Sequence, residues 1–296
     1  MHAFQFLVEY DFARYALVTG VAIAVACSLL SVIVVLKRMA FIGQGISHAG
    51  FGGMGVALFL GLGAGWLQNL LVLAFCLGTG VLIGVLSRRR RLETDSAIGI
   101  LLAGAMALGV VMTDLTVALQ EQSWYVALFG PLEQAPSFES LLFGSLLSVG
   151  AAEMWMAIAM SAAVVLTLAA VAKEMLFFTF DETVSRVFGV PAGAMYYLLL
   201  VLLSLTIVLS IRLVGFVLVS ALLVLPGAAA IMLSQRLDRV LLTSLGVGLA
   251  GVVGGLLLSL EVEELSSGPC IVLVLGALFA AAFAWRSSLN RWGRRA

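Results

Sequence analysis

The sequence predicts an all-α fold, a polytopic membrane bundle of about eight to nine transmembrane helices. Two observations carry this prediction. Of the 296 residues, 62% are hydrophobic and only 11% are charged, whereas about 25% of the residues in an ordinary soluble domain are charged. The apolar residues also occur in long runs, close to the roughly 20 residues that a helix needs to cross the hydrocarbon core. The chain therefore requires a bilayer.

Nine apolar segments bounded by charged or turn residues form the predicted spans. They cover residues 15–36, 44–62, 66–86, 96–113, 152–172, 192–211, 213–233, 240–260 and 269–285. Only Arg212 separates the sixth segment from the seventh, so one of these two is expected to be a short or broken helix. We expect residues 1–296 to form a single transmembrane domain.

Basic residues gather in alternate short connections, which predicts that those connections are cytoplasmic. Residues 88–91 are four consecutive arginines, whereas residues 261–268 contain three glutamates and no basic residue. This alternation places residues 1–14 outside and a tail at 287–296 in the cytoplasm. The longest connection, 114–151, contains Trp and Tyr and is expected to be an outer interfacial or re-entrant region.

Several classes of function are disfavoured. The formal net charge is zero, which gives no indication of a nucleic-acid partner. The three cysteines have no C-x-x-C spacing, so neither a disulfide framework nor a thiolate metal site is indicated. Neither Lys37 nor Lys173, the only lysines, belongs to a phosphate-binding loop. The chain is therefore predicted not to be an enzyme and to have no ATPase motif of its own.

His48 is the first candidate functional residue, because an ionisable side chain is costly within a membrane span. Imidazole is a common ligand of transition metals. Gln44 lies four residues earlier, on the same face of a helix. Two such faces at a dimer axis would supply four nitrogen or oxygen ligands to a metal in transit. The alternative, a histidine hydrogen-bonded to a neighbouring helix with help from Ser47, remains open at this stage.

Acidic residues lie near the predicted helix ends and are almost absent from the segment centres. Examples are Asp95, Asp114, Glu153 and Glu174. Secondary transporters coupled to protons usually need buried carboxylates as relays. A standalone, ATPase-independent secondary transporter is therefore the weaker alternative.

Residues 34–50, V-V-L-K-R-M-A-F-I-G-Q-G-I-S-H-A-G, resemble a motif of the permease subunits of zinc, manganese and iron ABC importers. Further similar blocks occur at 139–147, 180–191, 211–230 and 267–269, in the same order along nearly the whole chain. The resemblance implies a fold like that of type II ABC importers. It also implies import of a divalent transition metal through the inner or plasma membrane of a bacterial cell, with no intrinsic cofactor.

The resemblance implies partners as well. These are two cytoplasmic ATPase subunits that bind ATP, a second permease copy or paralogue, and an extracytoplasmic metal-binding protein. The expected ATPase-coupling loop is 228–240, including Arg236, Leu237 and Asp238. A second expected contact includes Asp181 and Glu182.

The chain departs from the family pattern at two places. Gln44 stands where relatives commonly have Asp, which removes a carboxylate from the predicted transit site and leaves the metal undefined. An insertion at about 117–137 is expected at the outer face, where it could contact the binding protein. Because the carboxylate is missing, a permease for a metal chelate or another small solute remains an alternative.

Overall fold

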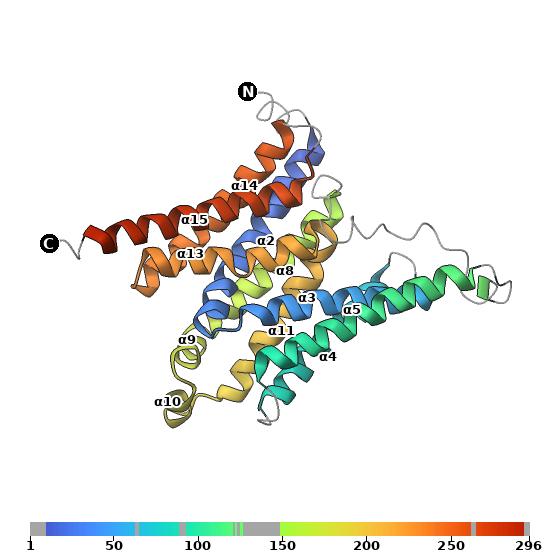
Figure 1. The fold of residues 1–296 in the computed structure, drawn as a ribbon, viewed down its shortest axis with the longest axis horizontal. Coiled ribbons are helices and arrows are strands. Elements are labelled where there is room, and N and C mark those ends of the chain that lie inside the picture. Colours follow the sequence, from blue (N-terminus) through green and yellow to red (C-terminus); the bar gives the residue numbers. More distant parts are fainter. Residues whose placement is uncertain are drawn as a thin grey trace.

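The computed structural model describes residues 10–62, 65–88, 93–120, 122, 125–126, 149–261 and 265–292. In this part of the chain all the regular elements are helices, as predicted (Figure 1). They are α2 (Asp11–Leu36), α3 (Ala40–Phe59), α4 (Trp66–Arg88), α5 (Thr94–Leu119), α8 (Ala151–Ala170), α9 (Ala172–Phe180), α10 (Glu182–Val187), α11 (Ala192–Val214), α12 (Phe216–Leu222), α13 (Leu225–Leu233), α14 (Leu237–Glu261) and α15 (Ser267–Trp292).

Each of the nine predicted apolar segments is helical in the structure. Seven described segments are long and apolar enough to cross a bilayer, with α12 and α13 together forming one of them. The other two predicted spans are α3, which has 20 residues, and α11, which has 23. The seventh predicted segment is the broken one, since Leu223 and Val224 interrupt it between α12 and α13. The chain is a multi-pass membrane protein.

A tight turn at Lys37–Met39 joins α2 to α3. Arg38 is left-handed, with φ of 57°, and the Met39 N–H donates to the Val34 carbonyl at 2.9 Å. The Arg38 N–H donates to the Val35 carbonyl at 3.0 Å. This is a Schellman motif, which satisfies the last carbonyls of α2. It reverses the chain within three residues, so that α3 begins beside the end of α2.

The helices form two groups. In one, α3 packs against α4 and α5; in the other, α2, α8, α13, α14 and α15 pack together. Two helices connect these groups, since α11 contacts α3 and α4 as well as α2 and α8, and α12 contacts α3 as well as α2 and α15. Figure 1 shows α11 running between the groups, with α9 and α10 at the end of the bundle where α11 begins.

Small residues allow helix backbones to approach closely within each group. A Cβ at Gly227 of α13 would lie 2.7 Å from the backbone of Ser31 in α2, and one at Gly52 of α3 would lie 2.7 Å from the Ala105 carbonyl of α5. The Ser31 hydroxyl accepts a hydrogen bond from the Gly227 N–H at 2.9 Å. Such contacts, with interhelical hydrogen bonds, are what hold membrane helices together.

Two predicted regions fall largely or wholly outside the described residues. These are the insertion at 117–137, with most of the connection 114–151, and the similar block at 139–147. Within the connection, α5 continues to Leu119. Tyr125 is buried, and its hydroxyl donates to the Phe59 carbonyl at the end of α3 at 2.7 Å. This part of the connection is therefore attached to the end of α3.

Candidate functional site

The structure places both predicted transit residues on α3. Gln44 is exposed and His48, one turn later, is half-buried. The residues between and around them, including Gly45, Ile46 and Ser47, are buried against other helices. The Ser47 hydroxyl donates to the Gly43 carbonyl of its own helix at 2.8 Å, so its proton is not donated to the imidazole. The two side chains thus lie on the one partly open face of an otherwise packed helix.

An aromatic ring lies beside the His48 imidazole and parallel to it. Phe216, the first residue of α12, stacks on it with 6.3 Å between ring centroids and 4° between the planes. Phe51 meets the same Phe216 ring edge-on, also at 6.3 Å. The sequence did not indicate this contact. The one feature of the sequence that relates to this contact is Gly215, which separates two apolar helices and directly precedes α12.

The described residues contain no group of three or more His, Cys, Asp or Glu side chains that could hold a metal ion. Among them, α3 offers one imidazole and one amide. This donor set can make weak and transient contacts to a divalent ion, because structural metal sites need about four protein ligands. A transporter must release the cation that it binds, so this weak donor set suits transport better than a closed four-ligand site does.

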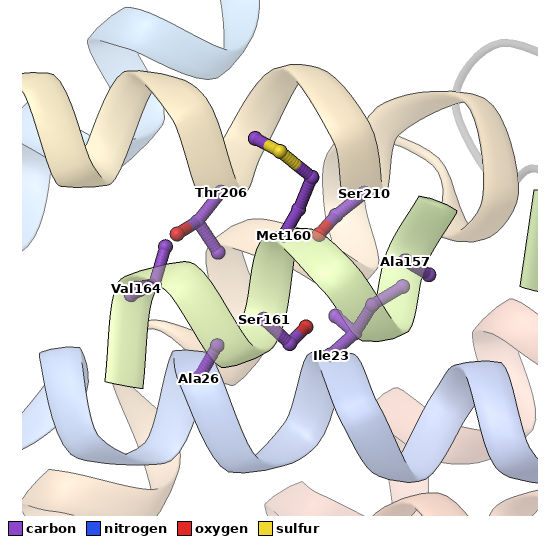
Figure 2. A pocket seen from close by; sticks show the side chains of 8 residues that line it. All are labelled: Ile23, Ala26, Ala157, Met160, Ser161, Val164, Thr206 and Ser210. Carbon is purple, nitrogen blue, oxygen red and sulfur yellow. The ribbon is translucent and has the colours of Figure 1, made fainter. Parts of the chain in front are cut away.

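A small cavity between α2, α8 and α11 lies apart from these residues (Figure 2). Its volume of about 10 Å³ leaves room for about one water molecule. The lining residues are Ile23, Ala26, Ala157, Met160, Ser161, Val164, Thr206 and Ser210. The Thr206 hydroxyl is already bonded to the Leu202 carbonyl of its own helix. Because neither His48 nor Gln44 lines this cavity, it is not part of the candidate transit site.

The helices α9 and α10 contain the second predicted coupling contact. Asp181 caps α10, since its carboxylate accepts hydrogen bonds from the N–H groups of Thr183 and Val184. Glu182 forms an ion pair with Arg186 on the same helix. The two acidic residues therefore stabilise the short helix itself.

Several apolar side chains around these acids are exposed. Val187 is 81% exposed and Phe188 is 72% exposed, and Phe180 on α9 is 67% exposed. We call these three residues the α9–α10 apolar patch. Sequence reasoning missed the patch because its residues look like core residues in a chain that is apolar throughout.

The α9 helix is also attached to the turn that precedes α3. The Lys37 ammonium lies 3.7 Å from the centroid of the Phe178 ring, a cation–π contact. The same ring meets Tyr196 of α11 edge-on. A displacement of α9 would therefore act directly on the start of the helix that contains Gln44 and His48.

The predicted coupling loop at 228–240 is more polar than the α9–α10 apolar patch. The end of α13, the connection 234–236 and the start of α14 make up this stretch, and Arg236 and Asp238 are exposed while Leu237 is half-buried. The Arg286 guanidinium of α15 donates to the Met232 carbonyl at 2.6 Å, which holds the end of α13 in place. This connection is short and polar, and it presents no apolar surface comparable to the α9–α10 apolar patch.

A multi-pass helical bundle with a partly open polar face on one span and no phosphate-binding loop in its sequence has the architecture of a membrane permease. The chain belongs to the ABC 3 transport family, whose model matches residues 9–286.

Named relatives agree with this assignment. The manganese transport system membrane protein of Halalkalibacterium halodurans is 31% identical over 95% of this chain and 89% of its own length. The chelated iron transport system membrane protein of Yersinia pestis is 30% identical over 92% of this chain and 85% of its own. Among solved structures, PsaBC from Streptococcus pneumoniae, in complex with Fab, matches with a TM-score of 0.77 and 26% identity over 95% of this chain and 94% of the other.

Proposed function

We propose that this chain is the membrane-spanning subunit of an ATP-driven importer that moves a divalent transition metal ion, manganese, iron or zinc, into the cytoplasm. The observation that carries the proposal is the position of His48, a half-buried imidazole on the partly open face of α3. Relatives named for manganese and iron transport, which align with more than nine-tenths of the chain, support the metal cargo.

In this proposal the metal passes the level of His48 and Gln44, and a second permease copy or paralogue supplies the matching face. Each protomer contributes an imidazole and an amide, both neutral. The family resemblance implies a carboxylate in relatives at the position of Gln44, and carboxylate ligands favour harder ions such as manganese. Its loss reduces the compensation of the cation's charge, so the ion is held weakly and can leave toward the cytoplasm.

Energy for transport must come from another chain, since this sequence has no phosphate-binding loop. We propose that two cytoplasmic ATPase subunits bind at the α9–α10 apolar patch. Exposed clusters of large apolar side chains next to charged residues mark protein interaction sites. The contact between Lys37 and Phe178 would then pass the movement of α9 to the start of α3. The connection 228–240 would be a secondary, polar contact.

An extracytoplasmic binding protein would deliver the metal at the opposite face, where the 117–137 insertion is expected.

A permease for a metal chelate is the second candidate. Gln44 favours it, since a chelated ion needs less charge compensation from the protein, and one relative is named for chelated iron transport. The face of α3 would then contact the chelator instead of the bare ion.

The function can be tested in a bacterial host that lacks its own manganese, iron and zinc importers. Producing this chain there with its ATPase and its binding protein should raise the cellular content of one of the three metals, measured by mass spectrometry. Leaving out the ATPase should remove the gain. A gain that persists without the ATPase would indicate a secondary transporter, and a gain that requires an added chelator would indicate the second candidate. No change in any metal would contradict both.

A further inference from the structure

The short helix α12 is separated from its neighbours by a backbone break at each end. Before it, Gly215 has φ of 80° and ψ of 164°, a conformation that is essentially restricted to glycine. After it, Val224 has φ of −124° and ψ of −52°, and the following α13 has Pro226 in its first turn. Neither α11 nor α13 continues its hydrogen-bond ladder through α12. The seven residues of α12 are therefore a separate short helix, bounded before its first residue by Gly215.

Both ends of α12 contact the α3 segment that contains the candidate transit residues. At the start, Phe216 stacks on His48 and lies within 3.4 Å of the position where Gly50 would have a Cβ. Past its end, Leu223 lies 3.3 Å from the corresponding position at Gly43. The helix thus runs antiparallel to α3, from the level of His48 to the residue before Gln44.

The placement of α12 links this segment to the rest of the protein. It contacts α3 in one helix group and α2 and α15 in the other. Phe216 is only 2% exposed, so its ring fills the space between α12 and α3. A change in the relative position of the two groups would act on α12 and would move the ring that lies parallel to the imidazole.

We propose that Phe216 is a positioning residue for His48 and that α12, pivoting at Gly215, is a gate that covers and uncovers the imidazole during transport. This inference rests on the proposed function. In the covered state, the stacked ring shields one face of the imidazole from water and fixes its plane. Withdrawal of α12 frees the imidazole to rotate and opens the α3 face to the passing ion.

Access of a reagent to position 48 can be measured without transport, by placing a thiol at this position. In the assembled, nucleotide-free transporter with His48→Cys, the rate of labelling by a charged methanethiosulfonate reagent reports access to this position. The native thiols of Cys27, Cys76 and Cys270 are buried and provide the background rate, measured in the chain that retains His48. Adding Phe216→Leu should increase the labelling rate severalfold, because the leucine side chain fills less of the space beside position 48 than the phenylalanine ring does.

Two variants control for disturbed packing. Phe51→Leu alters a buried aromatic residue that touches the Phe216 ring, and it should leave the labelling rate near that of His48→Cys alone. Phe216→Tyr keeps the ring and should also leave the rate unchanged. Equal rates for Phe216→Leu and Phe51→Leu, or no acceleration by Phe216→Leu, would overturn the gate.

Transport with His48 in place separates this inference from the proposed function. In reconstituted complex, Phe216→Leu should reduce the maximal rate of metal uptake about fivefold, and Phe216→Tyr should restore it. If uptake depends on His48 and yet Phe216→Leu behaves like Phe51→Leu, only the gate fails. If no metal is carried at all, the proposed function fails, while the labelling rates still show whether Phe216 limits access to position 48.

Discussion

Replacing His48 by alanine is expected to reduce metal uptake by the assembled transporter at least tenfold. The variant removes the one imidazole on the partly open face of α3 and leaves Gln44 as the only described polar side chain there. Changing residues that merely orient a metal ligand costs about 10–100-fold in affinity or activity. The loss of a ligand itself should therefore have an effect at least this large. Uptake of radioactive manganese, iron or zinc by reconstituted complex measures it.

A neighbouring residue offers a matched control. Ser47 is buried, and its hydroxyl donates to the Gly43 carbonyl of its own helix, so Ser47→Ala should leave uptake essentially unchanged. Both variants should associate with the ATPase as the parent does, because neither lies near α9 or α10. Unchanged uptake in His48→Ala would show that the histidine is a packing residue and that the ion takes another route.

Val187→Asp is expected to abolish the association of this chain with its ATPase. Val187 is 81% exposed, so the substitution removes little packing within the chain. In the proposed complex it would bury an unpaired carboxylate within an apolar contact. Central interface residues contribute 2 kcal/mol or more, so binding should weaken by about thirtyfold or more. Co-purification of the ATPase with the detergent-solubilised permease measures the effect.

Arg236→Ala, in the connection 228–240, is the comparison. Arg236 is exposed and polar, and its truncation should change co-purification of the ATPase only slightly. If Arg236→Ala releases the ATPase and Val187→Asp does not, the 228–240 loop is the main docking site and the α9–α10 apolar patch contacts something else, such as the membrane surface.

The fold was largely predictable because the bilayer imposes helices on apolar segments of this length. Each predicted span contains a helix, and one of the segments 192–211 and 213–233 was expected to be short or broken because only Arg212 separates them. The position of the boundary between these two segments was not predicted. The sequence indicated Arg212 as the boundary, whereas α11 continues to Val214 and Gly215 provides the break. A positive φ depends on how the two helices must pack, which a linear pattern does not reveal.

The candidate site was predictable only in part. His48 stood out because an ionisable group in a span is rare, whereas Asp181 and Glu182 were expected only from the family resemblance. The structure shows that these two acids cap and stabilise α10, while the exposed surface beside them is apolar. In a sequence with 62% hydrophobic residues, an exposed Val187 or Phe188 cannot be told from a buried one. Phe216 was missed because it reaches His48 only through the tertiary packing of α12 on α3.

The central claim is ATP-driven import of a metal ion through this chain, and uptake by sealed vesicles tests it most directly. The complete complex, with its ATPase and binding protein, would be reconstituted in liposomes with the binding-protein side exposed and ATP enclosed. We expect one of manganese, iron or zinc to accumulate inside above its external concentration, and a non-hydrolysable ATP analogue to prevent this. Metal entry that stops at equal concentrations and does not depend on ATP would contradict the account.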